Sequence, residues 1–347
     1  MKCYICDTED WHKITIPGDG GTRIPIHSKG CLQICKQCGN SCFDVDSTQE
    51  EKVKEYYRKD YRPAPNISNL ITTTHKVNYV RVFLTDLLKS FGGKKLKVAD
   101  VGCATGYLLN FFKQLGHSVT GSEYTVTFRR MAEHYYGIPV SEELDTQEKY
   151  DLITIYHVLE HMVEPDKKLS HYASLLSDDG HMLVSVPEWF NFVEEASGNV
   201  TSNFEHWFHK DHINIFSAAS VSNLFRKSGL IIVKEDHEQY GQTYLLRKAR
   251  TGELPKDWMV KESWTEQEKY ILRAKVAIEL FAANKFREAL EVEPKFPEAW
   301  MAIIFGKAAK DPSRQADLFA EAEKHIGKNK RFLTAKAQWH YQREELQ

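Results

Sequence analysis

The sequence predicts an α/β fold with a mainly parallel sheet, preceded by a small cysteine-rich module and followed by a helical tail. From about Lys94 to Arg247, strand and helix patterns alternate, which is typical of a parallel sheet covered by helices. Six of the seven cysteines fall before residue 43, and after Pro255 the strand patterns give way to helical periodicity. With 347 residues, the chain is long enough for two or three domains.

Charge and hydropathy narrow the classes of function. The formal net charge is −2, so no global positive field draws the chain toward nucleic acid or an anionic membrane. No apolar stretch is long enough to span a bilayer, and the N-terminal segment MKCYICDTED lacks the apolar core of a signal peptide. We therefore expect a cytoplasmic protein without a membrane partner. In that compartment, cysteines crowded at one end favour metal ligation over disulfides.

The first module, residues 1–46, contains two C-x-x-C knuckles separated by alternating isoleucines and glycine turns, a pattern that predicts a β-hairpin zinc ribbon. Two knuckles complete a tetrahedral four-thiolate site without an open coordination position, which favours a structural zinc ion. The expected ligands are Cys3, Cys6, Cys35 and Cys38. Cys31 and Cys42 lie outside the paired spacing, although either could substitute for a knuckle thiol.

Residues 47–93 are expected to form a helical linker or lid, and residues 94–250 the α/β domain. The predicted strands are Leu96–Val101, Ser118–Glu123, Leu152–Tyr156, His181–Pro187, Leu230–His237 and Gln242–Arg247. The predicted helices are Leu70–Phe91, Tyr107–Leu115, Thr125–Tyr136, Pro165–Leu176 and Ser217–Ser228. A short third-strand region is expected at Ile138–Val140, and the last two strands should form an antiparallel edge.

The segment KVADVGCATGY, Lys97–Tyr107, places a glycine turn between the first strand of this domain and a helix. Glycines let the backbone approach a ligand closely, and the free N–H groups at the start of the helix face it. The spacing D-x-G-x-x-x-G is neither the dinucleotide fingerprint nor a P-loop. It resembles the first motif of the class I S-adenosylmethionine-dependent methyltransferases.

Further segments match that family in the same order between Val98 and Leu246: VTGSEY, DLITIYHVLEHMVEP, GHMLVSVPE and HINIFSAASVSNLFRKSGL. The resemblance implies a Rossmann-like methyltransferase domain with S-adenosylmethionine as its cofactor. Glu123, at the end of the second strand, would reach both ribose hydroxyls. The residues implied to bind the cofactor are Asp100, Gly102, Cys103, Ala104, Gly106, Glu123, Tyr124 and His157. Cys103 would be a small packed side chain there, not a nucleophile. Three acids remain open for the adenine amino group: Glu142, Glu143 and Asp145.

Methyl transfer requires alignment of the acceptor with the cofactor, and a hydroxyl or acidic carbon acceptor also requires a base. Histidine suits this role at neutral pH. Candidates lie at the end of the fourth strand and in the segment EHWFHKDHINIF, which in this family forms a wall of the acceptor pocket. We rank His206 first as the base and His209 or His157 second. Tyr156 is placed beside them.

A zinc ribbon ahead of such a domain resembles the sugar C-methyltransferases, which implies a small-molecule acceptor such as a nucleotide-linked sugar or a glycan precursor. In those enzymes the module and its linking helix cover the acceptor pocket, which would bring in Tyr56, Tyr57 and residues between Tyr61 and His75. Those enzymes continue into a second α/β domain, whereas this chain continues into helices. Carbon, oxygen and nitrogen acceptors all stay open.

Two other functions remain as alternatives. One is a macromolecular methyltransferase that uses the ribbon and the tail for recognition. Near-neutral charge, the lack of a basic stripe and the lack of an N-P-P-Y/F motif after the fourth strand argue against a nucleic-acid substrate. The other is a non-catalytic scaffold, which the intact first motif and Glu123 disfavour.

The tail, residues 258–347, is predicted to be helical throughout. Thr265 to Glu268 form a capping-box pattern that would open a helix reaching about Ala282. Further helices are expected at Lys285–Val292, Pro297–Lys310, Pro312–Ile326 and Lys330–Glu344. The segment ALEVEPKFPEAW resembles the junction of a tetratricopeptide repeat, and about one and a half repeats are present. Such arrays need at least three repeats to be stable alone, so the tail should pack on the enzyme domain, self-associate or bind a protein partner.

Overall fold

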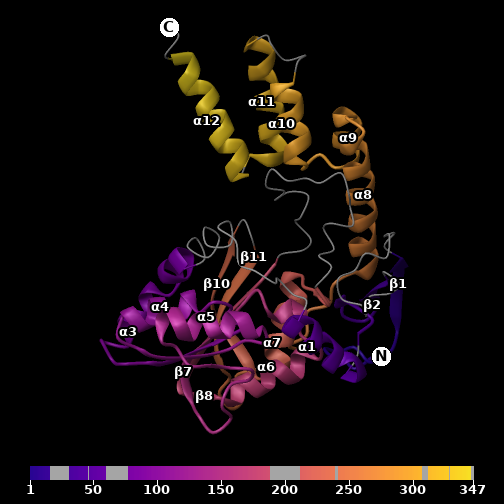
Figure 1. The fold of residues 1–347 in the computed structure, drawn as a ribbon. Coiled ribbons are helices and arrows are strands. Elements are labelled where there is room, and N and C mark those ends of the chain that lie inside the picture. Colours follow the sequence, from indigo (N-terminus) through magenta and orange to yellow (C-terminus); the bar gives the residue numbers. More distant parts are fainter. Residues whose placement is uncertain are drawn as a thin grey trace.

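The computed structural model describes residues 1–15, 31–45, 47–59, 77–187, 212–238, 241–306, 312–327 and 329–344. Within these residues the chain forms a seven-stranded sheet, a four-stranded sheet and a C-terminal set of helices (Figure 1). The predictions for Tyr61–His75, His206 and His209 lie outside the described residues. None of the helices in the described part of the chain is both long and apolar enough to cross a membrane.

The seven-stranded sheet confirms the predicted fold class. In spatial order its strands are β10 (Leu230–Glu238), β11 (Gly241–Lys248), β8 (Leu176–Val186), β7 (Tyr150–Tyr156), β4 (Lys97–Val101), β5 (Ser118–Ser122) and β6 (Val140–Ser141). The five strands from β8 to β6 are parallel. β11 pairs antiparallel with both β8 and β10, which is the antiparallel edge that the sequence predicted.

Alternate residues of these strands face two helical layers, because successive side chains of a strand point to opposite faces. Val98 and Leu152 pack against helical residues 77–83, α3 (Thr85–Ser90) and α4 (Tyr107–Gln114). Ile153 and Val184 pack on the opposite face against α6 (Pro165–Ser174) and α7 (Ala218–Lys227). The remaining helix of this domain, α5 (Val126–Tyr136), lies beside β6. The carboxyl ends of β4, β5 and β7 therefore meet at one edge of the sheet.

One strand is longer than expected. β8 begins at Leu176 instead of His181, because Leu176 pairs with Tyr150 and an irregularity in the register precedes the pairing of His181 with Leu152. The intervening residues, Ser177 to Gly180, are largely polar and carry no alternating apolar signal. Their extended conformation depends on the neighbouring strand, so sequence periodicity could not indicate it.

The cysteine-rich module forms the second, antiparallel sheet. Its strands are β1 (Trp11–Thr15), β2 (Cys31–Cys35), β3 (Ser41–Phe43) and β9 (Asn214–Ile215). The first three belong to the module, whereas β9 comes from the enzyme domain and pairs with β3. The backbone N–H of Phe43 also donates to Ile213, at 2.8 Å. The module is therefore joined to the larger domain through a shared sheet.

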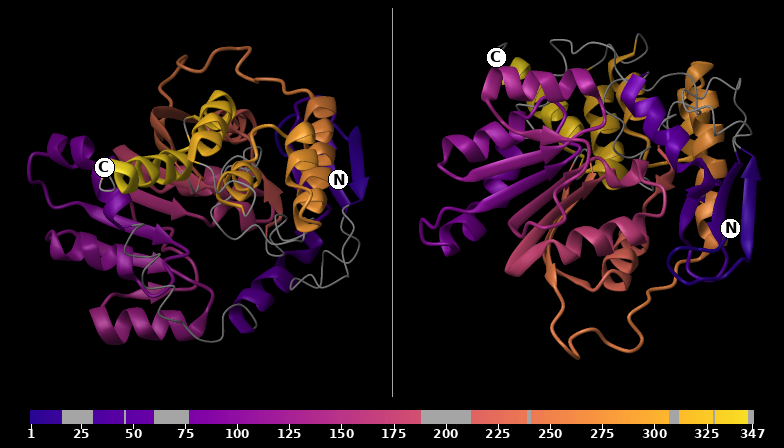
Figure 2. Two further views of the ribbon diagram at one scale, coloured as in Figure 1. Left: turned by 90° about the horizontal axis from the view of Figure 1, so that it is seen from above. Right: turned by 60° about the horizontal axis from the view of Figure 1, so that its bottom comes forward.

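The tail begins with α8 (Trp264–Ala282), which packs along the module. Ile271 and Ile278 of α8 share a buried cluster with Leu32 and Ile34 of β2, and Figure 2 (left) shows the helix beside the N-terminal strands. The helices α9 (Phe286–Val292), α10 (Pro297–Phe305), α11 (Pro312–Ile326) and α12 (Lys330–Glu344) follow. The first helix of the tail thus packs on the cysteine-rich module. Packing of the tail on the enzyme domain, self-association and binding of a protein partner stay predictions.

The start of α8 differs from the prediction. Ser263, not Thr265, is the N-cap, and its hydroxyl accepts a hydrogen bond from the N–H of Glu266 at 3.4 Å. The Thr265 hydroxyl lies 2.7 Å from that of Ser263. Trp264 therefore opens the helix, and its ring packs on His12 with ring centroids 4.4 Å apart. Trp264 thus joins the start of the helix to the module.

Candidate functional site

The loop after β4 has three residues in the left-handed backbone region. Gly102, Ala104 and Gly106 have φ values of 66°, 47° and 77°. A Cβ on Gly102 would lie 2.5 Å from Cγ2 of Val158, and one on Gly106 would lie 2.8 Å from Cβ of Ala132. Both positions therefore require glycine for their conformation and for lack of space. The result is a tight loop that leads into the N-terminus of α4.

Asp100 and Cys103 hold this loop against the neighbouring strands. The Asp100 carboxylate is 1% exposed and accepts a hydrogen bond of 2.6 Å from the Thr154 hydroxyl of β7. The Cys103 N–H donates to the carbonyl of Ser122 in β5 at 3.0 Å. The Cys103 side chain is buried beside Leu109 and Ile138, as expected for a small packed residue. The side chains of Asp100 and Cys103 therefore support the loop from within the domain.

Glu123, the residue after β5, reaches across to the same loop. Its two carboxylate oxygens accept hydrogen bonds from the N–H of Ala104 at 3.0 Å and the N–H of Thr125 at 2.8 Å. The structure thus brings together the glycine loop and the acidic residue, although Ala104 and Glu123 are nineteen positions apart in the sequence. Nucleotide-binding α/β folds use an acidic residue about twenty positions after the glycine loop to bind a ribose.

Tyr124 and the acids after β6 contact α1 (Glu50–Lys59), a helix of the predicted linker. The Tyr124 hydroxyl donates to Glu143 at 2.7 Å, and burial raises the pKa of this phenol. Lys54 forms an ion pair with Glu143 at 3.2 Å, and Arg58 forms one with Glu142. α1 is therefore fixed over the ends of β5 and β6. Which acid contacts adenine stays a prediction.

The other predicted site residues lie at the carboxyl end of β7. The Tyr156 and His157 rings are stacked, with centroids 4.8 Å apart. His157 has a φ of 55°, and its N–H donates to the Ser185 carbonyl at 2.8 Å. This left-handed backbone conformation costs a residue other than glycine about 1–3 kcal/mol of stability, and residues strained in this way cluster at functional sites. Gly102 abuts Val158, so this strand end adjoins the glycine loop.

Sequence reasoning did not recognise the group formed by Glu160, His161 and His212. The first two lie in the 3-10 turn η2 (Leu159–His161), and His212 lies just before β9. The three side chains offer ligand atoms that all lie within 4.8 Å of one another. The adjacent Glu-His pair was visible in the sequence, but the approach of His212 depends on a contact between segments about fifty residues apart.

The four predicted zinc ligands form one cluster. The Sγ atoms of Cys3 and Cys38 lie 3.6 Å apart, and those of Cys6 and Cys35 lie 3.5 Å apart. Tetrahedral zinc with bonds of about 2.3 Å separates its sulfur ligands by about 3.8 Å, so the cluster needs little change to hold the ion. The adjacent thiols of Cys3 and Cys35, together with burial, raise the pKa of Cys38. A bound cation would relieve that crowding by stabilising the thiolates.

Both knuckles have the same backbone geometry. Asp7 and Gly39 follow the second cysteine of each knuckle, with φ values of 62° and 79°. Their N–H groups each donate at 2.9 Å to the carbonyl of the first cysteine, Cys3 or Cys35. This repeated turn presents both thiols of a knuckle on one side, which is the chemistry of a structural four-sulfur site.

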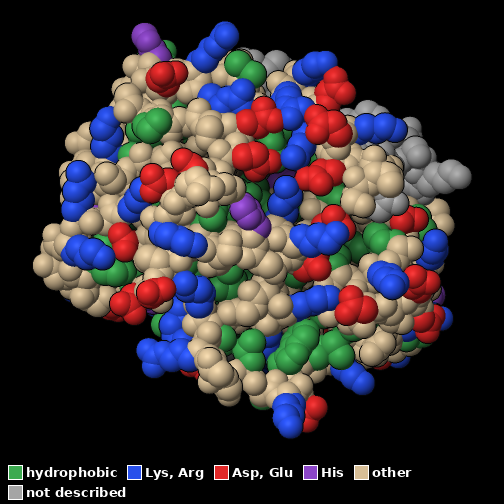
Figure 3. Space-filling view, turned by 90° about the horizontal axis from the view of Figure 1, so that it is seen from below, with side chains coloured by type: hydrophobic (Ala, Val, Ile, Leu, Met, Phe, Trp, Pro, Cys, Tyr) green, Lys and Arg blue, Asp and Glu red, His purple; other side chains and the backbone are tan. Residues whose placement is uncertain are grey.

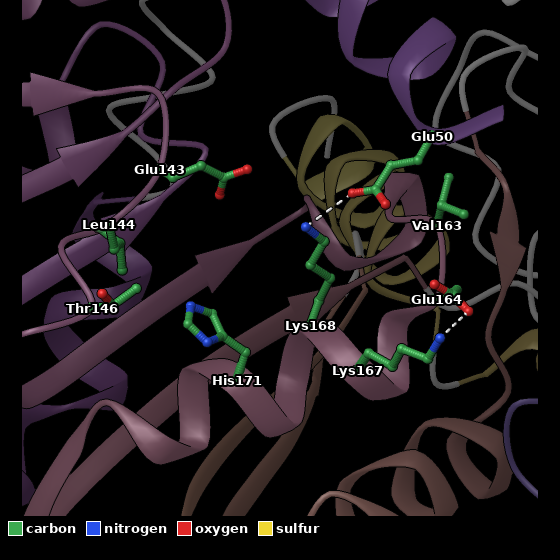
Figure 4. A pocket seen from close by; sticks show the side chains of 9 residues that line it. All are labelled: Glu50, Glu143, Leu144, Thr146, Val163, Glu164, Lys167, Lys168 and His171. Atoms are coloured by element: carbon green, nitrogen blue, oxygen red, sulfur yellow. Dashed lines mark hydrogen bonds and ion pairs between the residues drawn. The ribbon is translucent and has the colours of Figure 1, made fainter. Parts of the chain in front are cut away.

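A separate surface pocket of about 390 Å³ lies between α1, the loop after β6 and α6. Its charged side chains pair with one another: Lys168 with Glu50 at 3.0 Å and Lys167 with Glu164 at 2.5 Å (Figure 4). Glu143 lines the pocket and also bonds Tyr124. None of the glycine-loop residues lines it, so we do not assign the cofactor to this pocket.

Comparisons with known proteins agree with this geometry. The profile of a family described as a methyltransferase domain matches residues 55–235. The chain is 30% identical over 139 residues to a ubiquinone biosynthesis O-methyltransferase of Proteus mirabilis (strain HI4320), a match that covers 35% of this chain and 56% of the relative. It is 27% identical over 156 residues to the enzyme of the same name from Bordetella avium (strain 197N), covering 41% and 62%. The matches thus span 56% and 62% of the two relatives, less than two thirds of the length of either.

Comparison with solved structures matches magnesium protoporphyrin IX methyltransferase from Synechocystis PCC 6803 with bound S-adenosylmethionine. It superposes with a TM-score of 0.43 at 16% identity and covers 58% of this chain and 97% of that chain. The family profile extends over more than half of the sequence and includes the glycine loop, Glu123 and the end of β7. The chain therefore belongs to the family of S-adenosylmethionine-dependent methyltransferase domains.

Proposed function

We propose that this chain transfers a methyl group from S-adenosylmethionine to a small-molecule acceptor, of which a nucleotide-linked sugar or glycan precursor is the leading class. The observation that supports it most strongly is the contact of the Glu123 carboxylate with the N–H of Ala104 at 3.0 Å. It joins the acidic residue that would bind the ribose to the loop that would surround the methionine part of the cofactor.

The residues present fit this cofactor. Val158 crowds Gly102 and Ala132 crowds Gly106, so neither position can carry a side chain and the ligand can approach the backbone there closely. Glu123 supplies a carboxylate for two hydroxyls. When bound, S-adenosylmethionine supplies an electrophilic methyl group that a nucleophile displaces in line from the sulfonium.

His157 is the base that we favour among the described residues. Its imidazole lies at the carboxyl end of β7, next to the glycine loop, and is 32% exposed, so an acceptor can reach it. A neutral imidazole nitrogen would take the proton of an acceptor hydroxyl or acidic carbon. Tyr156, stacked on His157, would hold the ring in place. His206 and His209 remain candidates for the same task.

Three observations support a small acceptor. The chain has a net charge of −2, and on the face seen in Figure 3 positive and negative side chains are interspersed instead of gathered by sign. Nucleic-acid binding surfaces carry a basic stripe. By their names, the curated relatives methylate an oxygen in ubiquinone biosynthesis. The four-cysteine module ahead of the domain, joined to it through β9, supports the sugar class because of its resemblance to the sugar C-methyltransferases.

Calorimetric titration of S-adenosylhomocysteine into the zinc-replete chain tests the proposal. The wild type should bind one equivalent, and Glu123→Ala should weaken binding by tenfold or more because the ribose hydroxyls lose their acceptor. Glu133→Ala removes an exposed carboxylate from α5 and serves as the matched control, with unchanged affinity. A folded wild type that binds neither this ligand nor S-adenosylmethionine would overturn the proposal. Binding would justify screening nucleotide sugars as acceptors.

A further inference from the structure

We propose that Glu160, His161 and His212 form a second metal site, distinct from the four-cysteine cluster, that binds a divalent cation through nitrogen and oxygen. The three side chains come from η2 and from the segment before β9. Two imidazoles and one carboxylate are a ligand set that binds first-row divalent metals and leaves coordination positions open.

The distances fit ligation better than direct hydrogen bonding. Oε1 of Glu160 lies 3.8 Å from Nε2 of His161 and 3.9 Å from Nε2 of His212. These separations exceed the length of a hydrogen bond. Ligand atoms about 2.1 Å from a tetrahedral ion lie about 3.4 Å apart, so each of these two distances would contract by about 0.5 Å around a cation. The ligand atoms of the two imidazoles, which lie within 4.8 Å of each other, would also move together. Both imidazoles aim the same nitrogen at one carboxylate oxygen.

The burial of the group also points to a cation. The Glu160 side chain is 2% exposed, and those of His161 and His212 are 14% and 12% exposed. Buried carboxylates are retained where they are paired with positive charge or ligate a metal. A divalent ion here would be held by this buried carboxylate and by two neutral imidazoles, the form in which imidazole ligates metals.

Contacts with neighbouring residues hold the three side chains of the site in place. The side-chain amide of Asn214 donates to the Met162 carbonyl at 2.8 Å, and the N–H of Ile213 donates to the Glu160 carbonyl at 2.8 Å. Tyr57 of α1 packs edge-on against the His161 ring, with centroids 5.7 Å apart. β9 in turn pairs with β3 of the cysteine module. Such supporting contacts orient metal ligands in known sites.

The site adjoins the methyl-transfer residues. Nδ1 of His157 lies 3.8 Å from the same Oε1 of Glu160. If the proposed function holds, the open coordination positions would accept an oxygen of the acceptor and lower the pKa of its hydroxyl. The metal site itself does not depend on that function, because its ligands are defined by geometry alone.

Cobalt(II) distinguishes this site from the cysteine cluster. The full chain is first loaded with one equivalent of zinc, which the four thiolates retain because soft sulfur ligands select zinc. Titration with Co²⁺ should then reveal one site with visible bands but without the near-ultraviolet charge-transfer band of cobalt thiolates. Glu160→Gln should abolish these bands, and His161→Gln and His212→Gln should each weaken Co²⁺ binding at least tenfold. The control, His134→Gln, changes an exposed histidine on α5 and should bind as the wild type does.

Two results would overturn the proposal: no Co²⁺ binding to the zinc-loaded wild type, or equal binding to all variants. Circular dichroism of each variant, together with retention of its zinc, establishes that a loss of Co²⁺ is not a loss of fold. Titration of S-adenosylhomocysteine in parallel separates the two proposals. Co²⁺ binding without cofactor binding would leave the metal site in place and remove the proposed function.

Discussion

The crowding at Gly102 predicts a specific response to a single methyl group. Gly102→Ala places a Cβ in a left-handed conformation, φ 66°, and 2.5 Å from Cγ2 of Val158. The left-handed conformation costs an alanine about 1–2 kcal/mol. Overpacking of a filled site costs about 1–3 kcal/mol more. The free energy of unfolding should therefore fall by about 2–5 kcal/mol, a large part of the total for a typical domain.

Gly116→Ala is the matched control for this substitution. Gly116 also has a positive φ, 88°, but a Cβ there meets nothing within 4 Å. The free energy of unfolding of Gly116→Ala should therefore fall only by the cost of the left-handed conformation, about 1–2 kcal/mol. Urea unfolding gives both values, and their difference isolates the contact with Val158.

The same contact links stability to ligand binding. A loop that moves to relieve the clash moves the backbone N–H groups of the cofactor site, and each 1.4 kcal/mol that the bound state loses weakens S-adenosylhomocysteine tenfold. Adding Val158→Ala to Gly102→Ala should restore part of both losses, because the two changes are coupled. If Gly102→Ala were as stable as Gly116→Ala and bound the ligand as the wild type does, the crowded loop would have no part in the site.

Three further predictions concern the supports of the site. Thr154→Val removes the 2.6 Å hydrogen bond to buried Asp100 and should lower the free energy of unfolding by about 1–3 kcal/mol in urea titrations, whereas an unchanged midpoint would contradict that role. Cys38→Ser should lower bound zinc, measured by elemental analysis, and speed amide exchange in β1 to β3; full zinc content would show that the cluster tolerates three thiols. Burial raises the pKa of Glu262 above its ordinary value of 4.5, so its proton stabilises the fold at low pH and that contribution is lost as pH rises. Glu262→Gln should therefore gain stability relative to the wild type between pH 4 and pH 7, and an equal difference at both pH values would exclude this effect.

Elements with strong local signals could be predicted from the sequence. β4 and α4 lie within one residue of their predicted bounds, because the apolar run, the glycine turn and the helical pattern around Gly102 are all local. The cysteine cluster could be predicted from its two C-x-x-C knuckles for the same reason, because each knuckle is a turn closed by a local hydrogen bond.

Elements that depend on contacts distant in sequence could not be predicted in this way. β9 has only two residues and exists because Asn214 and Ile215 pair with β3, more than 170 residues earlier. The group of Glu160, His161 and His212 forms through the same segment. Neither β9 nor this group of side chains has a periodic sequence pattern, so a short stretch of sequence could not predict them.

The cysteine module is part of the structural support of the site as well as a separate fold unit. Its sheet includes β9, where the Asn214 side-chain amide lies 3.4 Å from the carbonyls of Leu159 and Glu160 in η2, and α8 packs on its other strands. The Gln267 side-chain amide of α8 donates to the carbonyl of Gly39 at 2.8 Å. The predicted boundary therefore separates the module from the enzyme domain in the sequence only. In the structure, backbone hydrogen bonds between β3 and β9 join the two.

A crystal structure of the chain with S-adenosylhomocysteine would test the assignment of the cofactor site most directly. We predict that the ligand lies against the backbone of Gly102 to Gly106, with both ribose hydroxyls on the carboxylate of Glu123 and its sulfur facing the end of β7 at His157. A ligand bound elsewhere, with the Glu123 carboxylate still on the N–H groups of Ala104 and Thr125, would contradict it.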